Sequence, residues 1–267
     1  MSAQRPVVPG RLHLLLAAQA PLAARTQHMP PGWLSAGEQA RLATLQHPAR
    51  RAEFLACRHA LRQLLALGSN TSTGDWRLDA PEGRAPHLNA QHHGEQAAAS
   101  THLSLSHSGA YLACALGHGQ PVGIDLEVKD LHAGRRDVLA LAAMACSPGE
   151  LAQLQALDDG PVRYRHFLQI WSLKEAYFKC TGTGVDFSSI RRIACMPAQV
   201  SAHGPAAAQN QVLACAHSWH GVVGPGLDML LSVCVHAAEG MPSCALQADE
   251  GIDWRGGGDW WLVALPG

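Results

Sequence analysis

The sequence predicts an α+β fold. Helical and strand-like patterns are mixed along the 267 residues rather than strictly alternating, which favours α+β over a doubly wound parallel sheet. Apolar residues make up 47% of the chain and charged residues 15%, a composition that excludes bulk disorder. The length fits one large domain or two small ones. It is also sufficient to bury a core without disulfide or metal staples.

The first predicted element is a β-strand over residues 11–18. The alternative is a secretory signal, because Arg5 and Arg11 precede the apolar run LHLLLAAQAPLAA. His13 and Gln19 interrupt that run, and a strand explains it as well. No apolar run reaches the length of about 18 residues that a membrane span needs, so we expect no membrane segment.

Two helices are predicted next. Ser35 and Glu38 have the spacing of a capping box, which begins a helix that runs to about Gln46. Pro48 fits the first turn of a second helix that ends near Leu67, with Gly68 as a left-handed stop.

An arginine stripe lies beside the apolar face of the second helix. Arg51, Arg58 and Arg62 are seven and four residues apart, so they share one side of that helix. Spacing alone favours a solvated edge that covers the rim of the core, and an anion-binding site is the alternative.

The rest of the chain alternates irregularly between loop, strand and helix. Residues 69–101 are rich in Gly, Ser, Thr, His and Asn, and they predict a long loop with at most one short strand. Strands are then predicted over residues 102–106, 111–116, 122–128, 190–196, 211–220, 228–236 and 260–265, and helices over residues 148–157, capped by Ser147, and 162–181, ended by Gly182.

Charge and cysteine usage exclude some functional classes. The net charge of -1 provides no global field for nucleic acid. The sixteen His form no HExxH motif, and the eight Cys form no CxxC pair. The cysteines mostly lie in apolar contexts, so we expect reduced, buried thiols in a cytoplasmic protein.

The segment VGIDLEV at residues 122–128 carries two carboxylates. Positions i and i+2 of a strand face the same side, so Asp125 and Glu127 project together. Neighbouring carboxylates repel one another unless a cation lies between them, and Mg²⁺ prefers oxygen ligands. An ordinary solvent-facing strand edge is the alternative.

The segment WSLKEAYFKCTGTG at residues 171–184 contains two of the three lysines in a chain that has seventeen arginines. Glu175 and Lys179 lie one helical turn apart, which also suits a plain helix salt bridge. The aromatic neighbours Trp171, Tyr177 and Phe178 indicate a partly shielded face instead. There a Glu could bind metal or act as a base, and a Lys could neutralise a phosphate.

The segment LSLSHSG at residues 103–109 leads from a strand into a small polar turn. Its hydroxyls, backbone N–H groups and His107 together suit a phosphate cradle. A Ser–His hydrolase is a weaker alternative, because Ser106 and His107 are adjacent and point apart, and no GxSxG elbow is present.

These three motifs occur in an order that resembles the 4′-phosphopantetheinyl transferases of the larger, Sfp-like type. That family has a G-[IV]-D-x-E strand, followed some forty or more residues later by W-x-x-K-E-[AS]-x-x-K-x-x-G. Residues 123–127 and 171–184 match these patterns, and EFLACRHALRQLL resembles the family's arginine-bearing helix. The resemblance covers roughly residues 11–200.

The resemblance implies two similar α+β halves related by a pseudo-twofold axis, with residues 1–119 binding the 3′-phosphate of coenzyme A and residues 120–267 carrying the magnesium and catalytic motifs. It implies transfer of 4′-phosphopantetheine from coenzyme A to a serine of an apo acyl or peptidyl carrier protein, with release of adenosine 3′,5′-bisphosphate. A chain of this length is expected to act as a cytoplasmic monomer without nucleic-acid or membrane partners.

The resemblance also assigns residues. Asp125, Glu127 and Glu175 are expected to bind Mg²⁺, Glu175 to help deprotonate the carrier serine, and Lys179 to contact the phosphate under attack. Coenzyme A is expected to contact a further set of residues, namely Arg51 with Arg50, Arg58, Arg84, Ser106, His107, Lys174 and Lys179.

Two positions depart from the family pattern. Gly83-Arg84-Ala85-Pro86 replaces its usual G-K-P triplet, and Cys57 replaces a small Gly. A non-catalytic module that binds coenzyme A or a carrier is the first alternative function. A different metal-dependent phosphohydrolase is the second.

Overall fold

The structure is a computed structural model, which describes residues 10–67, 69, 71–79, 85–132, 137–198, 211–224, 226–236 and 240–266. The chain divides into two compact units. Unit 1 comprises Met1–Val122 and Pro242–Asp249, and unit 2 comprises Gly123–Met241 and Glu250–Gly267. Each unit combines helices with an extended sheet, so the α+β class is confirmed. The predicted halves, 1–119 and 120–267, differ from these units chiefly in residues 242–249. The pseudo-twofold relation between the halves stays a prediction.

Unit 1 is built from a four-stranded sheet and its covering helices. The sheet has the order β10-β1-β5-β4, and a separate two-stranded sheet pairs β2 with β3. The elements are β1 (Leu12–Ala18), α1 (Gln19–Arg25), α2 (Ala36–Thr44), α3 (Pro48–Ala66), β2 (Leu78–Asp79), β3 (His87–Leu88), α4 (Ala90–His93), α5 (Glu95–Ser100), β4 (Thr101–Ser108), β5 (Tyr111–His118) and β10 (Cys244–Ala248).

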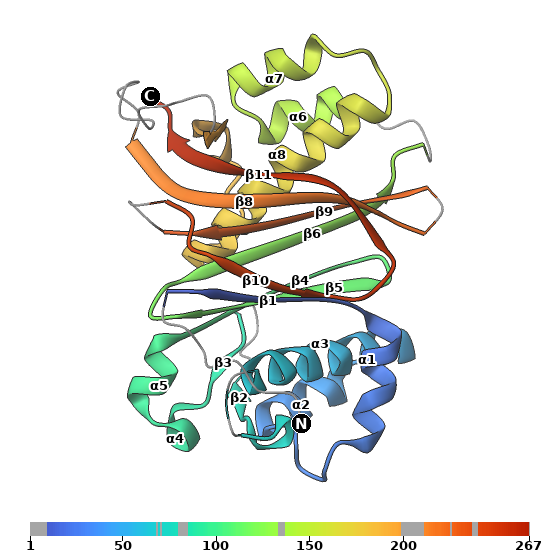
Figure 1. Cartoon of the computed structure of the whole chain (residues 1–267), viewed down its shortest axis with the longest axis vertical. Helices are drawn as coiled ribbons and strands as arrows, with labels where there is room; N and C mark the ends of the chain where they lie inside the picture. The colour runs from blue at the N-terminus through green and yellow to red at the C-terminus, as the bar shows by residue number, and fades with distance from the viewer. Residues whose placement is uncertain are drawn as a thin grey trace. The chain divides into compact units, whose positions relative to one another are not determined.

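Helix α3 provides most of the apolar side of this unit. Its side chains Leu61 and Leu64 are fully buried against Leu112 and Cys114 of β5, and Figure 1 shows α3 and α1 lying along the sheet. Each fully buried leucine contributes about 1.5–3 kcal/mol relative to an exposed one. Apolar burial of this face therefore fixes α3 on the sheet.

In its described residues, unit 2 combines a five-stranded sheet of order β6-β9-β8-β11-β7 with three α-helices. The elements are β6 (Val122–Asp130, whose first residue belongs to unit 1), α6 (Val138–Ala145), α7 (Pro148–Gln155), α8 (Pro161–Thr181), β7 (Ile193–Pro197), β8 (Gln211–Val223), β9 (Leu227–Val235) and β11 (Ile252–Ala264).

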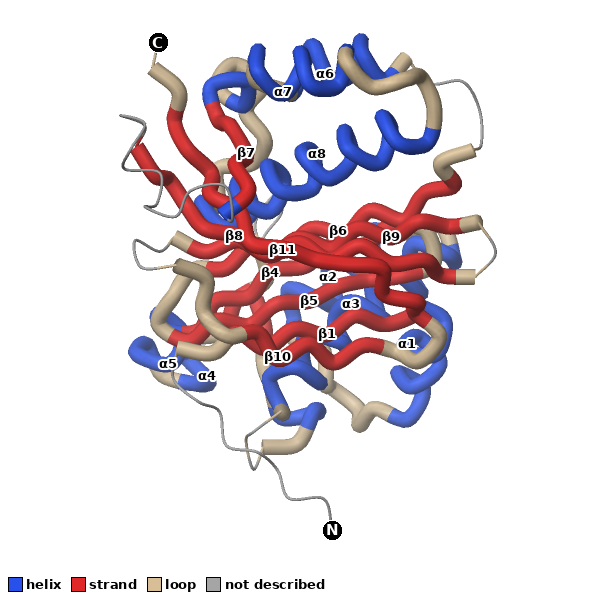
Figure 2. The backbone as a smooth tube through the Cα atoms, turned by 45° about the horizontal axis from the view of Figure 1, so that its top comes forward, coloured by secondary structure: helices blue, strands red, loops and turns tan. Residues whose placement is uncertain are grey.

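Helix α8 is the central helix of unit 2. It lies across the sheet, and α6 and α7 cover its other side (Figure 2). Its residues Leu173 and Ala176 are fully buried in the same cluster as Leu230 and Cys234 of β9. The helix ends at Gly182, whose φ of 70° is the left-handed conformation that favours glycine. Every motif residue from Trp171 to Thr181 is therefore held on one rigid element.

Most predicted elements are confirmed. The first predicted strand is β1, an interior strand of its sheet. The predicted capping box at Ser35 and the predicted cap at Ser147 both form, and Ser147 is also part of a complete capping box with Glu150. The prediction of one long loop over residues 69–101 was wrong in part, because its described portion contains β2, β3, α4 and α5. Helices α1 and α6 and strand β10 were not predicted. Gly68 lies outside the described residues.

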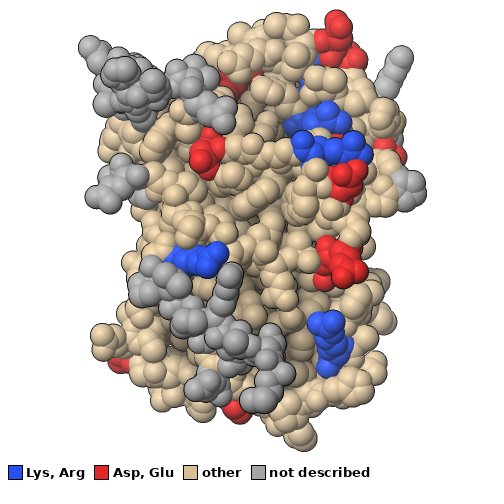
Figure 3. Space-filling model, viewed as in Figure 1, with Lys and Arg blue, Asp and Glu red and all other residues tan. Residues whose placement is uncertain are grey.

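Two general expectations can be compared with the structure. All eight cysteines are free thiols, and six of them are buried. Among the described helices, none combines the length and the apolarity that a membrane crossing requires. On the face drawn in Figure 3, the visible Lys, Arg, Asp and Glu side chains lie in small separate groups rather than in one large basic patch.

Candidate functional site

Gly123 lets strand β6 and helix α8 approach each other unusually closely. A Cβ atom at Gly123 would lie 1.9 Å from the carbonyl oxygen of Ala176 and 2.4 Å from the backbone nitrogen of Cys180. Both neighbours are backbone atoms, which cannot rotate away. Only glycine fits this contact, and the contact brings the polar side chains of β6 next to those of α8.

Three carboxylates gather where β6 and α8 meet. Asp125 and Glu127 come from the strand, with Asp125 4% exposed, and Glu175 comes from the helix. Along β6, Asp125 and Glu127 alternate with the buried apolar residues Ile124 and Leu126. The structure thus brings together the three residues that the resemblance assigns to the metal.

Two lysines bind this carboxylate cluster of Asp125, Glu127 and Glu175. Lys179 Nζ lies 2.7 Å from Asp125 Oδ1 and 3.7 Å from Glu175 Oε2. Lys129 Nζ lies 2.9 Å from Glu127 Oε2. Lys179 is thus the cation shared by strand and helix, whereas Lys129 borders the cluster.

The carboxylates perturb one another. Burial raises the pKa of Glu127, and the charge of Asp125 raises it further. Burial likewise raises the pKa of Glu175, with additional contributions from Asp125 and Glu127, while Lys179 opposes both shifts. The three groups therefore repel one another, and a cation placed among them would be stabilised.

The donor set has the chemistry of a Mg²⁺ site. Partly buried carboxylate oxygens are the ligands that this ion prefers. In the part of the chain that the structure describes, no three such side chains already converge as a complete ligand set. Asp125 is held by Lys179 instead. The mutual repulsion of these carboxylates therefore fits a divalent cation.

An apolar hollow of about 290 Å³ adjoins the carboxylate cluster, because Glu127 of the cluster and the neighbouring Lys129 both line it. Leu141, Met144 and Phe187 line the hollow and are 40%, 57% and 53% exposed, so they form a patch of large apolar side chains. Grouped exposed apolar side chains are typical of interaction sites.

Lys174 lies in the core of unit 2, whereas its motif neighbour Lys179 contacts the carboxylate cluster. Lys174 is fully buried, and its ammonium donates to Glu150 Oε2 at 2.7 Å and to the carbonyl oxygens of Ala145 at 2.9 Å and Ile190 at 3.3 Å. An ammonium has three N–H donors, and all three are used. These contacts argue against the predicted direct contact of Lys174 with coenzyme A and give it a structural role.

Glu150, the partner of Lys174, was missed from the sequence as an important residue. Its two oxygens accept hydrogen bonds from the backbone nitrogens of Ser147 and Cys195 as well as from Lys174. The spacing of Ser147 and Glu150 is a capping-box signal that could have identified the carboxylate, although not its lysine partner.

In unit 1, Ser106 and His107 lie on strand β4. The His107 side chain is 42% exposed, and its Nε2 lies 3.6 Å from Glu53 Oε1, which also accepts a 2.9 Å hydrogen bond from Arg50. Ser106 is buried. His107 is therefore accessible to a ligand, and Arg50 and Glu53 lie beside it.

Arg51 and Arg84 were also predicted to contact coenzyme A. Arg51 Nη1 donates to the carbonyl oxygens of Leu42 and Leu45, so it caps the end of α2. Arg84 lies outside the described residues.

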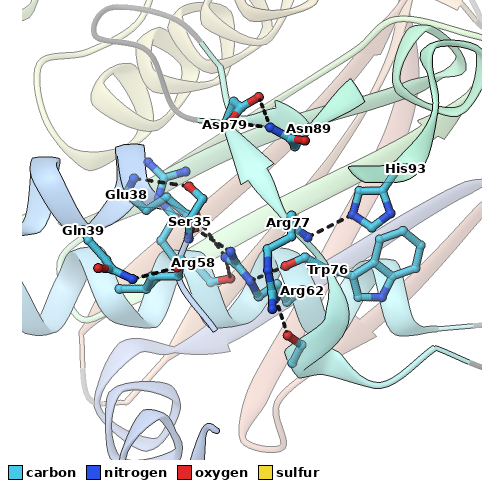
Figure 4. Close-up of polar contacts among 12 residues, drawn as sticks. Ser35, Glu38, Gln39, Arg58, Arg62, Trp76, Arg77, Asp79, Asn89 and His93 are labelled. Carbon is cyan, nitrogen blue, oxygen red and sulfur yellow. Dashed lines mark hydrogen bonds and ion pairs between the residues drawn. The ribbon is translucent and has the colours of Figure 1, made fainter. Parts of the chain in front are cut away.

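Arg58 and Arg62 share the buried carboxylate of Glu38 (Figure 4). Arg62 is fully buried and donates to both oxygens of Glu38, so the predicted solvated edge is wrong for this residue. Arg58 lies over the ring of Phe54, and its Nε, 3.7 Å from Glu38 Oε1, is buried together with Nη1 without a hydrogen bond. Burial lowers the pKa of Arg58. One carboxylate thus faces two guanidinium groups.

Comparison with known proteins identifies the segment that carries the carboxylate cluster. Residues 121–227 match the family model of the 4′-phosphopantetheinyl transferase superfamily. This segment contains β6 and α8, and therefore Asp125, Glu127, Glu175 and Lys179.

Individual relatives agree with the family match. The protein slr0495 of Synechocystis sp. is 31% identical over 159 residues, and the 4′-phosphopantetheinyl transferase HetI of Nostoc sp. is 33% identical over 153 residues. These alignments cover 58% and 57% of this chain and 61% of each relative. The 4′-phosphopantetheinyl transferase Sfp of Bacillus subtilis is 34% identical over 85 residues, which are 32% of this chain and 34% of Sfp. The chain therefore matches about three fifths of the length of its first two relatives, and its residues 121–227 are similar to the 4′-phosphopantetheinyl transferase superfamily.

Proposed function

We propose that this chain transfers 4′-phosphopantetheine from coenzyme A to a serine of an apo acyl or peptidyl carrier protein, with Mg²⁺ as cofactor. The observation that carries the proposal is the carboxylate cluster with Lys179, which lies inside the family-matched segment. Transfer of a phosphoryl-type group requires mainly charge neutralisation and alignment, and this cluster has the side chains for both.

Asp125, Glu127 and Glu175 would hold the magnesium ion. When bound, the ion supplies positive charge to the pyrophosphate of coenzyme A. The raised pKa values of Glu127 and Glu175 support this assignment, because repelling carboxylates gain stability from a divalent cation.

Glu175 would act as the general base, and Lys179 would stabilise the negative charge that develops on the phosphate. The serine Oγ attacks the phosphorus that bears the pantetheine arm, its proton passes to Glu175, and the bond from that phosphorus to the bridging oxygen breaks. Adenosine 3′,5′-bisphosphate leaves with the bond's electron pair. Lys179 donates a hydrogen bond to the phosphate oxygens as their charge develops. The shielding of Glu175 makes its carboxylate a stronger base than an exposed one.

The 3′-phosphate of coenzyme A would bind in unit 1. His107 is the accessible group for this role, with Ser106 beside it and Arg51, Arg58 and Arg84 as further candidates. The two buried nitrogens of Arg58 that make no hydrogen bond support an anion nearby. Lys174 is left out of this set, and we assign it to positioning α8 through Glu150.

The apo carrier would dock on the apolar hollow beside Glu127. The carrier must present its serine next to the carboxylate cluster. The exposed side chains of Met144 and Phe187 line the same hollow as Glu127 of that cluster. We further propose a cytoplasmic location, which the free thiols support, and a monomer, as the length of the chain suggests. No nucleic-acid partner is proposed, in keeping with the net charge of -1.

The deciding experiment mixes the protein with coenzyme A, Mg²⁺ and several apo carriers, and then measures the intact mass of each carrier. The proposal predicts addition of one phosphopantetheine group and loss of the reaction when a chelator removes the metal. Binding of coenzyme A without any adduct on the carriers would favour the alternative, a non-catalytic module that binds coenzyme A or a carrier.

The docking site has a separate test. Phe187→Asp is expected to raise the KM for the carrier while leaving coenzyme A binding unchanged. Val162→Asp is the matched control, because Val162 is also an exposed apolar residue of unit 2, at 61%, but it does not line the hollow. Equal effects of the two substitutions would contradict docking at the hollow.

A further inference from the structure

A second pocket of unit 2 lies between the first half of α8 and the sheet, away from the carboxylate cluster. Its volume is about 320 Å³, and its walls include Arg165 and Gln169 of α8, His220 of β8 and Trp260 of β11. Ligand pockets in proteins span roughly 300–1,000 Å³. This one is therefore at the small end and suits a single ring rather than a dinucleotide.

Glycines create the floor of this pocket. Gly256 and Gly258 lie on β11, and a Cβ atom at either position would meet no atom within 4 Å. Gly258 pairs with Ser218, whose Oγ accepts a 2.8 Å hydrogen bond from Trp260 Nε1. Gly257 faces a close neighbour, since its Cβ would lie 2.9 Å from the carbonyl oxygen of Ser218. Glycine weakens a strand, so Gly256 and Gly258, which no neighbour crowds, indicate that open space above the backbone matters.

The charges around the pocket are already compensated. Arg165 Nε donates to Asp228 Oδ1 at 2.9 Å, and His220 Nε2 lies 2.8 Å from the same oxygen. Asp259, the lining carboxylate, is paired with His217. An anion at Arg165 would compete with Asp228, and a cation would meet no unpaired carboxylate among the described lining residues. An uncharged ligand is therefore favoured.

Gln169 defines the hydrogen-bonding character of the pocket. Its Nε2 donates to Ser218 Oγ at 3.2 Å. Its carbonyl oxygen and second N–H make no hydrogen bond within the described residues. A carboxamide with a donor and an acceptor left over is complementary to another group of the same kind.

We propose that this pocket binds one planar, uncharged ring that carries an adjacent hydrogen-bond donor and acceptor, such as an aromatic carboxamide or a nucleobase edge. The glycine floor accepts the flat ring, Trp260 and Pro197 supply apolar contact, and Gln169 pairs with the polar edge. None of Asp125, Glu127, Glu175 and Lys179 lines this pocket, so its walls are separate from those of the proposed transfer site. Its ligand binding does not depend on the proposed transferase function.

The test uses three probes of one shape and different charge: benzamide, benzoate and benzamidine. Ligand-observed NMR titrations of the full chain are expected to show benzamide binding about tenfold or more tightly than either charged probe, since each of these brings an unpaired charge into the pocket. Gly258→Leu, which fills the open space, is expected to abolish the benzamide signal. Gly149→Leu is the matched control, because Gly149 also has open space around it but lies on α7.

A second variant keeps the test decisive if Gly258→Leu does not fold. Gln169→Leu is expected to weaken benzamide binding about tenfold through loss of the paired hydrogen bonds, and Gln155→Leu at the exposed end of α7 should have no effect. Absence of benzamide binding, equal binding of the three probes, or binding that survives both pocket variants would each overturn the proposal.

Discussion

The substitution Gly123→Ala tests how the close contact of β6 and α8 builds the carboxylate cluster. The new methyl carbon would lie 1.9 Å from the carbonyl oxygen of Ala176, whereas real Cβ atoms stay at least 3.0 Å from such atoms. Strand and helix must therefore separate by about 1 Å or more. Overpacking of this kind costs typically 1–3 kcal/mol of folding free energy.

The same displacement is expected to affect catalysis more than stability. Moving α8 away from β6 lengthens the 2.7 Å contact between Lys179 and Asp125 and separates Glu175 from the strand carboxylates. A misplacement of ~1 Å in an active site costs about 10²-fold in rate. We expect Gly123→Ala to fold, to lose about 1–3 kcal/mol of stability and to transfer phosphopantetheine about 10²-fold more slowly.

Urea unfolding and the initial rate of carrier modification measure the two effects. Gly149→Ala is the control, because a Cβ at Gly149 meets nothing within 4 Å and alanine favours the helix that contains it. A Gly123→Ala variant with the stability and rate of the wild type would refute the claim that this glycine sets the distance between the two motifs.

Three further predictions concern charged groups. Lys174→Met is expected to lower the free energy of unfolding by about 3–5 kcal/mol, because it leaves Glu150 buried without its cation; a loss below about 1 kcal/mol in urea unfolding would contradict the structural role. Lys179→Arg is expected to slow transfer by about 10²-fold, since a planar guanidinium does not replace a compact ammonium, and normal turnover would remove the special role of lysine. Burial lowers the pKa of His13 and of His118 below the ordinary 6.5. Below pH 6.5 the unfolded chain therefore binds protons that the folded chain does not, and the stability of unit 1 should fall as the pH drops through this range. His59, His93 and His102 of unit 1 also have lowered pKa values through burial. Replacing His13 and His118 with Phe should therefore reduce the dependence in denaturation curves recorded from pH 7 to 5, and an unchanged slope would exclude these two as a cause.

Local signals were sufficient for much of the fold. The caps at Ser35 and Ser147 and the stop at Gly182 depend on hydrogen bonds and backbone conformation within a few residues, so the sequence alone predicted them. Strand β10 was missed because it pairs in parallel with β1, more than 200 residues away, and no local pattern reports such a partner. Helix α6 was missed because its sequence VLALAAMA is almost uniformly apolar and has no 3.6-residue period.

The candidate site shows the same division between local and long-range information. Period-two alternation placed Asp125 and Glu127 together, and the i, i+4 spacing placed Glu175 beside Lys179. Lys174 lies five residues before Lys179, which is about 140° around a helix of 3.6 residues per turn. The two lysines therefore cannot share a face, although only the structure shows that Lys174 meets the buried Glu150.

The buried arginines could not be resolved from the sequence. Arg58 and Arg62 lie on a helix whose spacing suits a solvated edge, and their burial depends on Glu38 of another helix. No single motif in the sequence shows which carboxylate from another segment will neutralise an arginine. Only the packing of α2 against α3 could therefore decide whether these arginines form a solvated edge or an anion-binding site.

The most direct test of the central claim, that the carboxylate cluster performs the transfer, is the rate of carrier modification by Glu175→Gln, measured by intact mass alongside a calorimetric titration with coenzyme A. The amide keeps the size of the side chain but removes its charge and its basicity. The account predicts a rate lowered by about 10²–10⁴-fold with coenzyme A binding largely preserved. Modification of the carrier at the wild-type rate would contradict the assignment of Glu175 and, with it, the site built around it.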